Sequence, residues 1–287
     1  MKLLKKLASA AALTLAFAAT ANASTVINDW TLNPLGTGGA AAGTVVNESL
    51  DVNGNAFIAI TATGANTFSF TESAAFAITG KDGGISLGNY GTNKVTATFQ
   101  ASGTGTFNGA FTFTSGTINI YSGLDQYGSA NGIYGANTGT LIASFTVLAG
   151  GGGLVDASGA PTGNGQVSVF AQALTPGGLQ PGYFFNSAGT DLSTQDILSF
   201  AFTNANPTLN PSAAAVREIA CEFGGYTGPG CAAGTSYSNV PGQYLFVGNN
   251  GQFKLAEAPE PGSLALFGIA MLGAGVVSRK RAAKKAA

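Results

Sequence analysis

The sequence predicts an all-β domain, built as a single large β-sandwich or jelly-roll with one short helix. Bulky residues alternate with Thr, Ser or Ala at period two in many short runs, the pattern of half-buried strands. Glycine occupies 43 of 287 positions and, with asparagine, separates these runs. Hydrophobic residues make up 45% and aromatic residues 10% of the chain, which is enough to form a core.

The strand-like runs are rich in β-branched and aromatic side chains, which suit a pleated surface. They cover residues 56–60, 67–71, 75–78, 94–99, 110–113, 117–120, 141–147, 166–171, 198–203 and 244–247. Asn53-Gly54 and residues 103–105 supply the positive φ angles of hairpin turns. We expect the glycine run 150–153 to be a long loop rather than a linker between two domains. Pro211 and the alanines after it predict a short helix over 211–219.

The composition excludes several classes of function. The chain has no histidine, so a histidine-based catalytic triad and histidine metal ligands are ruled out. It has 12 basic residues and a net charge of −1, which argues against nucleic-acid binding. The charge is uneven: residues 24–258 have a net charge of −8, and the two ends are basic. Basic ends on an acidic body indicate targeting segments at the termini.

Residues 1–23 have the pattern of a secretory signal peptide. Lys2, Lys5 and Lys6 precede an apolar stretch over 7–19, and Ala21 and Ala23 are the small residues of a signal-peptidase site before Ser24. The alternative, an amphipathic N-terminal helix, fits poorly because the stretch has no polar face. We therefore expect an exported domain over residues 24–258.

The C-terminal segment 259–287 combines three features in order. Pro259, Glu260 and Pro261 come first, an uncharged apolar stretch runs from Leu264 to Val277, and a basic tail includes Arg279, Lys280 and Arg281. A helix over 263–277 would be about 22 Å long, short of the hydrocarbon layer of about 30 Å. It would cross the inner membrane only marginally, with its basic end in the cytoplasm.

This arrangement resembles the PEP-CTERM sorting signal of Gram-negative bacteria. The resemblance implies recognition by exosortase, a membrane-embedded cysteine protease, which removes the helix before the protein reaches the cell surface or the extracellular polysaccharide. The alternative is a plain C-terminal membrane anchor. Either way, the domains are a signal peptide (1–23), an exported β-rich domain (24–258) and a sorting segment (259–287).

Cys221 and Cys231 enclose a glycine-rich loop. Because export brings them into an oxidising compartment, we predict a disulfide between them. A redox or metal pair is the alternative, but the spacing does not match a CxxC motif.

No catalytic motif is present, and we predict that the protein is not an enzyme. Six acidic residues are the candidates for a two-carboxylate glycoside hydrolase: Asp125, Asp156, Asp191, Asp196, Glu218 and Glu222. They form no pattern, and we interpret each as a turn or loop residue. Residues 51–55 resemble the first half of a calcium loop, but Ala56 and Ala62 stand where glycine and glutamate are required, so we predict a turn there. No metal ligands are assigned, and calcium bound by other loop carboxylates is left open.

Two aromatic groups are candidates for stacking against sugars: Tyr183, Phe184 and Phe185, and the separate tyrosines Tyr121, Tyr127 and Tyr134. Packing in the core or in capped loops is the alternative for them. Several segments also resemble the flocculation-associated PEP-CTERM proteins, among them 29–30, 67–72, 148–153, 202–206, 221–231 and 249–256. This resemblance implies a surface or matrix protein that aggregates cells together with exported polysaccharide, in flocs or biofilm. The alternatives are a secreted carbohydrate-binding module or a glycoside hydrolase.

Overall fold

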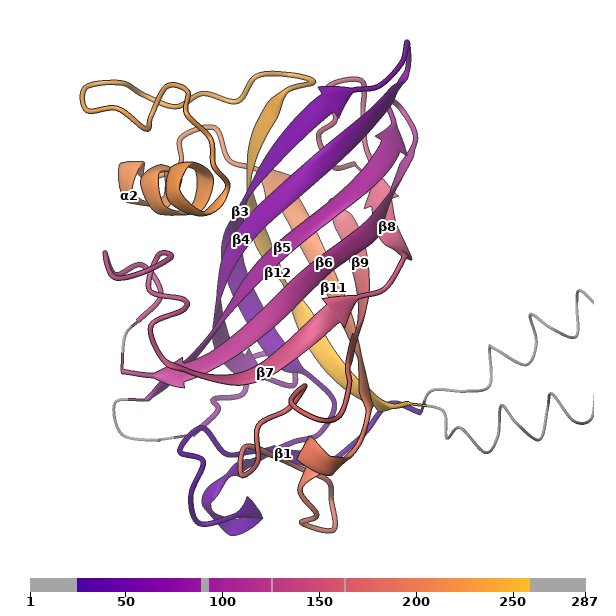
Figure 1. Cartoon of the computed structure of the whole chain (residues 1–287), viewed down its shortest axis with the longest axis vertical. Coiled ribbons are helices and arrows are strands. Elements are labelled where there is room, and N and C mark those ends of the chain that lie inside the picture. The colour runs from indigo at the N-terminus through magenta and orange to yellow at the C-terminus, as the bar shows by residue number, and fades with distance from the viewer. Residues whose placement is uncertain (1–24, 89–92, 125, 163, 259–287) are drawn as a thin grey trace, which may run out of the picture. The chain divides into compact units, whose positions relative to one another are not determined.

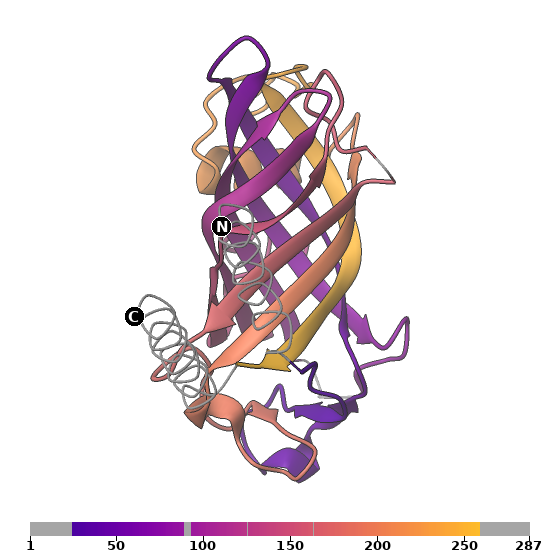
Figure 2. The same cartoon turned by 90° about the vertical axis from the view of Figure 1, so that its right-hand side faces the viewer.

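Eight long strands close into an antiparallel β-barrel (Figures 1 and 2). This is a computed structural model, and it describes residues 25–88, 93–124, 126–162 and 164–258. Around the barrel the order is β11-β12-β3-β4-β5-β6-β7-β9, and β9 pairs with β11 to close the ring. The strands are β3 (Leu50–Ala62), β4 (Thr67–Lys81), β5 (Lys94–Thr106), β6 (Ala110–Gly123), β7 (Thr140–Val147), β9 (Gln166–Ala173), β11 (Ile197–Pro207) and β12 (Tyr244–Glu257).

The prediction of a sandwich or jelly-roll was therefore wrong. The decisive contact is the ladder between β9 and β11, which runs from Ala173↔Ile197 to Gln166↔Asn204 and leaves no open edge between those strands. Small residues on the inner face allow the sheet to coil this tightly. At Gly103, for example, an added Cβ would lie 2.4 Å from the ring of Phe70 and 2.2 Å from the carbonyl oxygen of Thr112.

The glycine run was also predicted wrongly, because it forms a strand rather than a loop. β8 (Gly150–Leu154) pairs with β6 on one side and β9 on the other. Gly152 has φ of +111°, and a Cβ there would lie 1.9 Å from the carbonyl oxygen of Phe111. Only glycine therefore allows the three strands to approach at this point.

The alternating pattern divides each strand between core and surface. On β4, Phe68, Phe70 and Ile78 are buried in the core, while Thr71 and Thr79 are exposed. Glu72 shares the inward face of β4, because it is two residues from Phe70. It lines internal cavities together with Asn249 of β12.

A short helical segment packs outside the barrel against β3 and β4 (Figure 1). It consists of α2 (Ala213–Ala215) and a π-helical stretch, η3 (Val216–Phe223), so it extends beyond the predicted 211–219. The Ser212 hydroxyl accepts a hydrogen bond from the Ala215 N–H and caps the helix. Val216, Ile219 and Ala220 bury their side chains against a second cluster that includes Phe57 and Phe246.

At one end of the barrel lies a small sheet, in the order β10-β1-β2. Its strands are β1 (Trp30–Leu32), β2 (Thr44–Val46) and β10 (Phe184–Phe185). Two short 3-10 turns accompany it, η1 (Ala40–Ala42) and η2 (Leu192–Thr194). Trp30 is fully buried and stacks on Phe184, so this sheet extends the barrel core.

Candidate functional site

The outer surface carries an open cleft of about 580 Å³ whose walls include Phe57, Tyr226 and Tyr244, and we call it the tyrosine cleft. The rings of Tyr226 and Tyr244 have centroids 4.9 Å apart. Phe57 lies 5.1 Å from Tyr226 and stacks on Tyr244 at 6.0 Å. The cleft thus offers two half-buried phenol rings on a buried aromatic base.

The two tyrosines come from distant parts of the chain. Tyr244 begins β12 and pairs with Ala59 of β3, which places its ring beside Phe57. Tyr226 lies in the loop after η3, and its N–H donates a hydrogen bond to the Ala220 carbonyl. Cys221 and Cys231 form a disulfide, with Cα atoms 5.7 Å apart, and this closes the loop that holds Tyr226. The cleft therefore depends on both the barrel and the disulfide.

Hydroxyl groups surround the rings, because Thr227, Ser236 and Ser238 also line the cleft. Partial burial, and the nearby Tyr244, raise the pKa of Tyr226 above its usual value. Tyr226 therefore stays a neutral phenol at neutral pH. The tyrosine cleft combines apolar ring faces with neutral hydrogen-bonding groups.

A second open groove, of about 940 Å³, crosses the outer surface over β3, β12, β11, β9 and β8, and we call it the amide groove. Its exposed side chains are four amides, one hydroxyl and two apolar groups: Asn53, Gln166, Asn204, Asn250, Thr79, Leu154 and Phe202. Phe202 is 49% exposed, which is unusual for a phenylalanine in a strand. This groove also offers neutral hydrogen-bonding groups.

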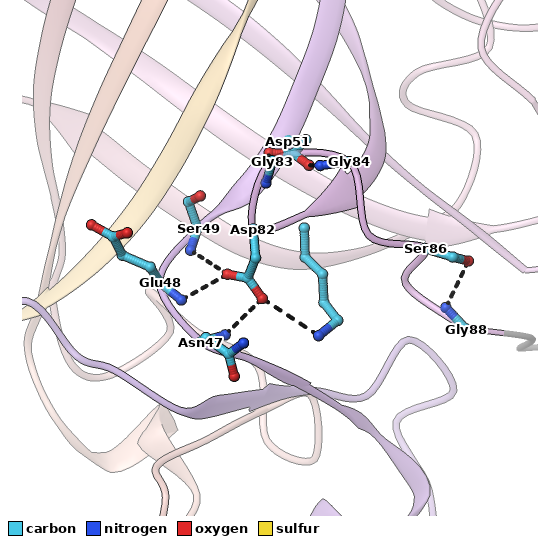
Figure 3. Close-up of polar contacts among 10 residues, drawn as sticks. Asn47, Glu48, Ser49, Asp51, Asp82, Gly83, Gly84, Ser86 and Gly88 are labelled. Atoms are coloured by element: carbon cyan, nitrogen blue, oxygen red, sulfur yellow. Dashed lines mark hydrogen bonds and ion pairs between the residues drawn. The ribbon is translucent and has the colours of Figure 1, made fainter.

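Asp51 lines the amide groove, and it and the nearby Asp82 are held by backbone N–H groups (Figure 3). Asp51 accepts hydrogen bonds from the N–H groups of Gly83 and Gly84, at 3.1 and 2.6 Å. Asp82 accepts from the N–H groups of residues 47, 48 and 49 at 2.8–3.1 Å. Burial acts to raise the pKa of Asp82, but these three bonds and Lys81 hold it below its usual value. Residues 51–55 belong to strand β3, so the turn predicted there was wrong.

Three of the six acidic candidates for hydrolysis hold local structure instead. Asp156 accepts from Ser158 and Ala160, Asp191 caps η2 through the Ser193 N–H, and Asp196 accepts from Thr175. Glu218 pairs with Arg217 at 2.7 Å, while Glu222 lies 3.9 Å from the same guanidinium. Asp125 is outside the described residues. Among the described candidates, only Glu218 and Glu222 share a partner, and neither lines the tyrosine cleft or the amide groove.

The aromatic residues singled out from the sequence do not form one platform. Phe184 and Phe185 are buried strand residues, and Tyr183 packs on the core. Tyr127 and Tyr134 contact each other edge-on at 5.0 Å, and the Tyr127 hydroxyl accepts a hydrogen bond from Asn55. Tyr121 lies on β6. Sequence reasoning missed Tyr226 and Tyr244; the position of Tyr226 inside the disulfide loop was the available signal.

The predicted processing residues lie outside the described part of the chain. They are Ala21, Ala23 and Ser24 at the signal-peptidase site, Pro259, Glu260 and Pro261 in the motif, the apolar stretch 264–277, and Arg279, Lys280 and Arg281 in the tail. Among the helices that the structure does describe, none is long and apolar enough to span a membrane.

Comparison with known proteins identifies the C-terminal segment. Residues 257–281 match the PEP-CTERM protein-sorting motif, which contains the Pro-Glu-Pro sequence, the apolar stretch and the first basic residues. No curated protein matches the chain, and no solved structure matches it. The motif implies processing by exosortase, export and sorting to the cell surface. The chain therefore carries a PEP-CTERM protein-sorting motif at residues 257–281.

Proposed function

We propose that the barrel binds extracellular polysaccharide through the tyrosine cleft and so holds cells together in flocs or biofilm, without catalysis. The tyrosine cleft carries this proposal. Sugar rings have apolar C–H faces and hydroxyl edges, and the cleft presents phenol faces of Tyr226 and Tyr244 beside hydroxyls of Thr227, Ser236 and Ser238. The PEP-CTERM motif at residues 257–281 brings the domain to the compartment where such polymers lie.

A polymeric ligand can be held firmly by binding sites of modest affinity. A polysaccharide repeats the same unit many times, so one bound unit raises the effective concentration of its neighbours. The amide groove is a second surface that offers neutral amide groups and the exposed ring of Phe202. Two glycan-binding surfaces on one barrel would cross-link polymer chains, which is the step that aggregation requires.

Binding without hydrolysis is favoured by the lining of the clefts. A glycoside hydrolase needs two carboxyl groups about 5–10 Å apart at the scissile bond. Among the described residues, no carboxylate lines the tyrosine cleft, and Asp51 is the only one that lines the amide groove. Both oxygens of Asp51 already accept backbone hydrogen bonds. The resemblance of several segments to flocculation-associated proteins agrees with an aggregating role.

The proposal is tested by titrating the processed protein with the polysaccharide of its own host in a calorimeter. Removing one ring, as in Tyr226→Ala or Tyr244→Ala, should weaken binding by about tenfold or more, by analogy with other ring-stacking contacts worth about 1–3 kcal/mol. Tyr226→Phe keeps the ring face and is the matched control for packing. Phe202→Ala measures how much the amide groove contributes to the affinity for the polysaccharide.

Two results would contradict the proposal. One is equal affinity of the wild type and both alanine variants, provided that their circular dichroism spectra are the same. The other is the release of new reducing ends during long incubation with the polysaccharide. In cells, deletion of the gene should reduce floc formation and polysaccharide retention, and the Tyr226→Ala variant should restore neither fully.

A further inference from the structure

A carboxylate points into the barrel core. Glu72 lies on the inward face of β4, in line with Phe68 and Phe70. The residue is half-buried and lines two cavities, and no cationic side chain lines either of them among the described residues. Burial raises the pKa of Glu72 to about 7. A carboxyl group without a partner is costly on the inward face of a barrel strand, so its presence there needs an explanation.

Two cavities meet at this side chain. One has a volume of about 60 Å³ and the other about 30 Å³. Glu72, Thr203 and Asn249 are the polar residues that line both. The remaining walls of the larger cavity are apolar and include the rings of Phe76, Phe99 and Phe113.

Asn249 supplies the second, independent observation. It is only 4% exposed, and its Oδ1 atom has no hydrogen-bond partner. A buried amide oxygen without a donor costs about 1–3 kcal/mol. The carboxyl group of Glu72 and the amide oxygen of Asn249 thus line the same largely apolar space, and the Thr203 hydroxyl that also lines it bonds to neither of them.

We propose that the barrel interior is a binding site for a small primary alkylammonium ion, whose N–H groups donate to Glu72 and Asn249. Such an ion supplies three donors and a positive charge at its head, and a short apolar chain behind it. Phenylalanine faces also attract cations, so the walls suit both ends of the ligand. At about 15 Å³ for each water-sized group, 60 Å³ holds about four non-hydrogen atoms, the size of propylammonium.

This ligand class is distinct from the glycan of the outer surface. A sugar ring is too large for a cavity of about 60 Å³, and an alkylammonium ion does not need the rings of Tyr226 and Tyr244. Alkylammonium binding in the barrel is therefore independent of polysaccharide binding on its outer surface. No covalent bond changes on binding: where Glu72 is protonated beforehand, its proton passes to the buffer as the carboxylate pairs with the ammonium group.

The test is calorimetric titration of the full chain with methyl-, ethyl-, propyl- and hexylammonium chloride at pH 6 and pH 8. We expect saturable binding of the short ions, weaker binding of hexylammonium, and proton release at pH 6 but not at pH 8. Proton release is read from the change in observed heat between buffers of different ionisation enthalpy. Propanol and potassium chloride serve as comparators for the apolar chain and for charge alone.

Variants locate the site. Glu72→Gln is isosteric with the protonated acid, so it should fold, and it should weaken propylammonium binding about tenfold or more because a charge-assisted hydrogen bond is lost. Asn249→Leu should weaken it as well. Glu222→Gln, on the exposed helix, is the matched control and should bind as the wild type does.

Three results would overturn the inference. These are an equal response to propanol and propylammonium, saturation by potassium chloride alone, and unchanged binding by a folded Glu72→Gln variant. The first two would leave the cavity as a site for water or a simple ion, and the third would place the ammonium ion elsewhere. Loss of glycan binding in the Tyr226→Ala variant bears on none of them.

Discussion

The rings of Phe57 and Tyr226 lie 5.1 Å apart, so a side chain of barrel strand β3 directly contacts the loop that Cys221 and Cys231 close. Through this contact, the outer face of the barrel and the disulfide loop form one surface. The same cluster includes Tyr237 and Phe246, which anchor the chain before and within β12. The disulfide is thus coupled to the shape of the tyrosine cleft.

Replacing Cys221 and Cys231 together by serine should loosen this loop. Closing a ring of about eleven residues stabilises a fold by about 3 kcal/mol in the chain-entropy model. We expect a lower midpoint of urea unfolding and a weaker glycan affinity. Under reducing conditions, the wild type should approach the variant in both measurements, and an unchanged glycan affinity would show that the cleft forms without the disulfide.

Stability should fall as pH rises from about 4.5 to about 7. Glu72 has its pKa raised in the folded barrel, so the folded state binds its proton more tightly than the unfolded chain does. The stabilisation is complete below the unfolded pKa and is lost as pH rises through the folded one, a change on the order of 3 kcal/mol. Urea unfolding in steps of pH measures it. Glu72→Gln should show little change in this window and should be more stable than the wild type above pH 7.

Asp82→Asn should destabilise the turn beside the barrel. Asp82 has φ of +52°, which asparagine tolerates, but the amide replaces one acceptor oxygen by a donor. We expect a loss of about 1–2 kcal/mol. Because the folded pKa of Asp82 is lowered, its contribution is fully present above the unfolded pKa and is lost as pH falls through the folded one. Asp29→Asn, also at positive φ, controls for the backbone, and equal effects of the two substitutions would argue against the hydrogen-bond explanation.

Replacing Pro259, Glu260 and Pro261 by alanine should block processing. In cells with an active exosortase, an epitope tag after Ala287 should be lost from the wild type but kept on the variant. Immunoblots of membrane and surface fractions give the result. Deletion of the exosortase gene should reproduce the variant; a tag that the wild type retains would indicate a plain membrane anchor.

Calcium should support aggregation where the host glycan is anionic. Residues 24–258 have a net charge of −8, so direct contact with an anionic polymer is repulsive. Bridging divalent cations would relieve this repulsion. We expect EDTA to disperse flocs and added calcium to restore them, as measured by turbidity; flocs that survive EDTA unchanged would contradict the prediction.

The sequence predicted the strands well, because alternation is a local property, but the hairpin turns expected at Asn53-Gly54 and at residues 103–105 lie inside β3 and β5. Every strand-like run identified from it lies within a strand, although 67–71 and 75–78 merge into β4, and 110–113 and 117–120 into β6. The closed barrel could not be predicted in this way. Closure depends on the pairing of β9 with β11, and alternation looks the same in a barrel and in a sandwich.

The candidate sites also differ in how far the sequence could have predicted them. Tyr226 and Tyr244 are far apart in the sequence and meet only because β12 pairs with β3 and the disulfide folds the loop back. Glu72, in contrast, had a signal in the sequence. It follows Phe68 and Phe70 at period two, so alternation alone places it on their inward face.

Barrel closure has a further consequence for how this protein could bring cells together. An open, uncharged, glycine-rich sheet would expose backbone N–H and C=O groups along its edges, and such edges recruit strands from other molecules. Here the backbone groups of β9 and β11 are hydrogen-bonded to each other where the sheet closes. Where β9 and β11 are paired, copies of the protein cannot associate by adding strands, as they do in amyloid-type fibres. Contacts between copies must therefore be made by the barrel surfaces. An assembly held in that way is reversible, and cells could leave it without unfolding the protein that joined them.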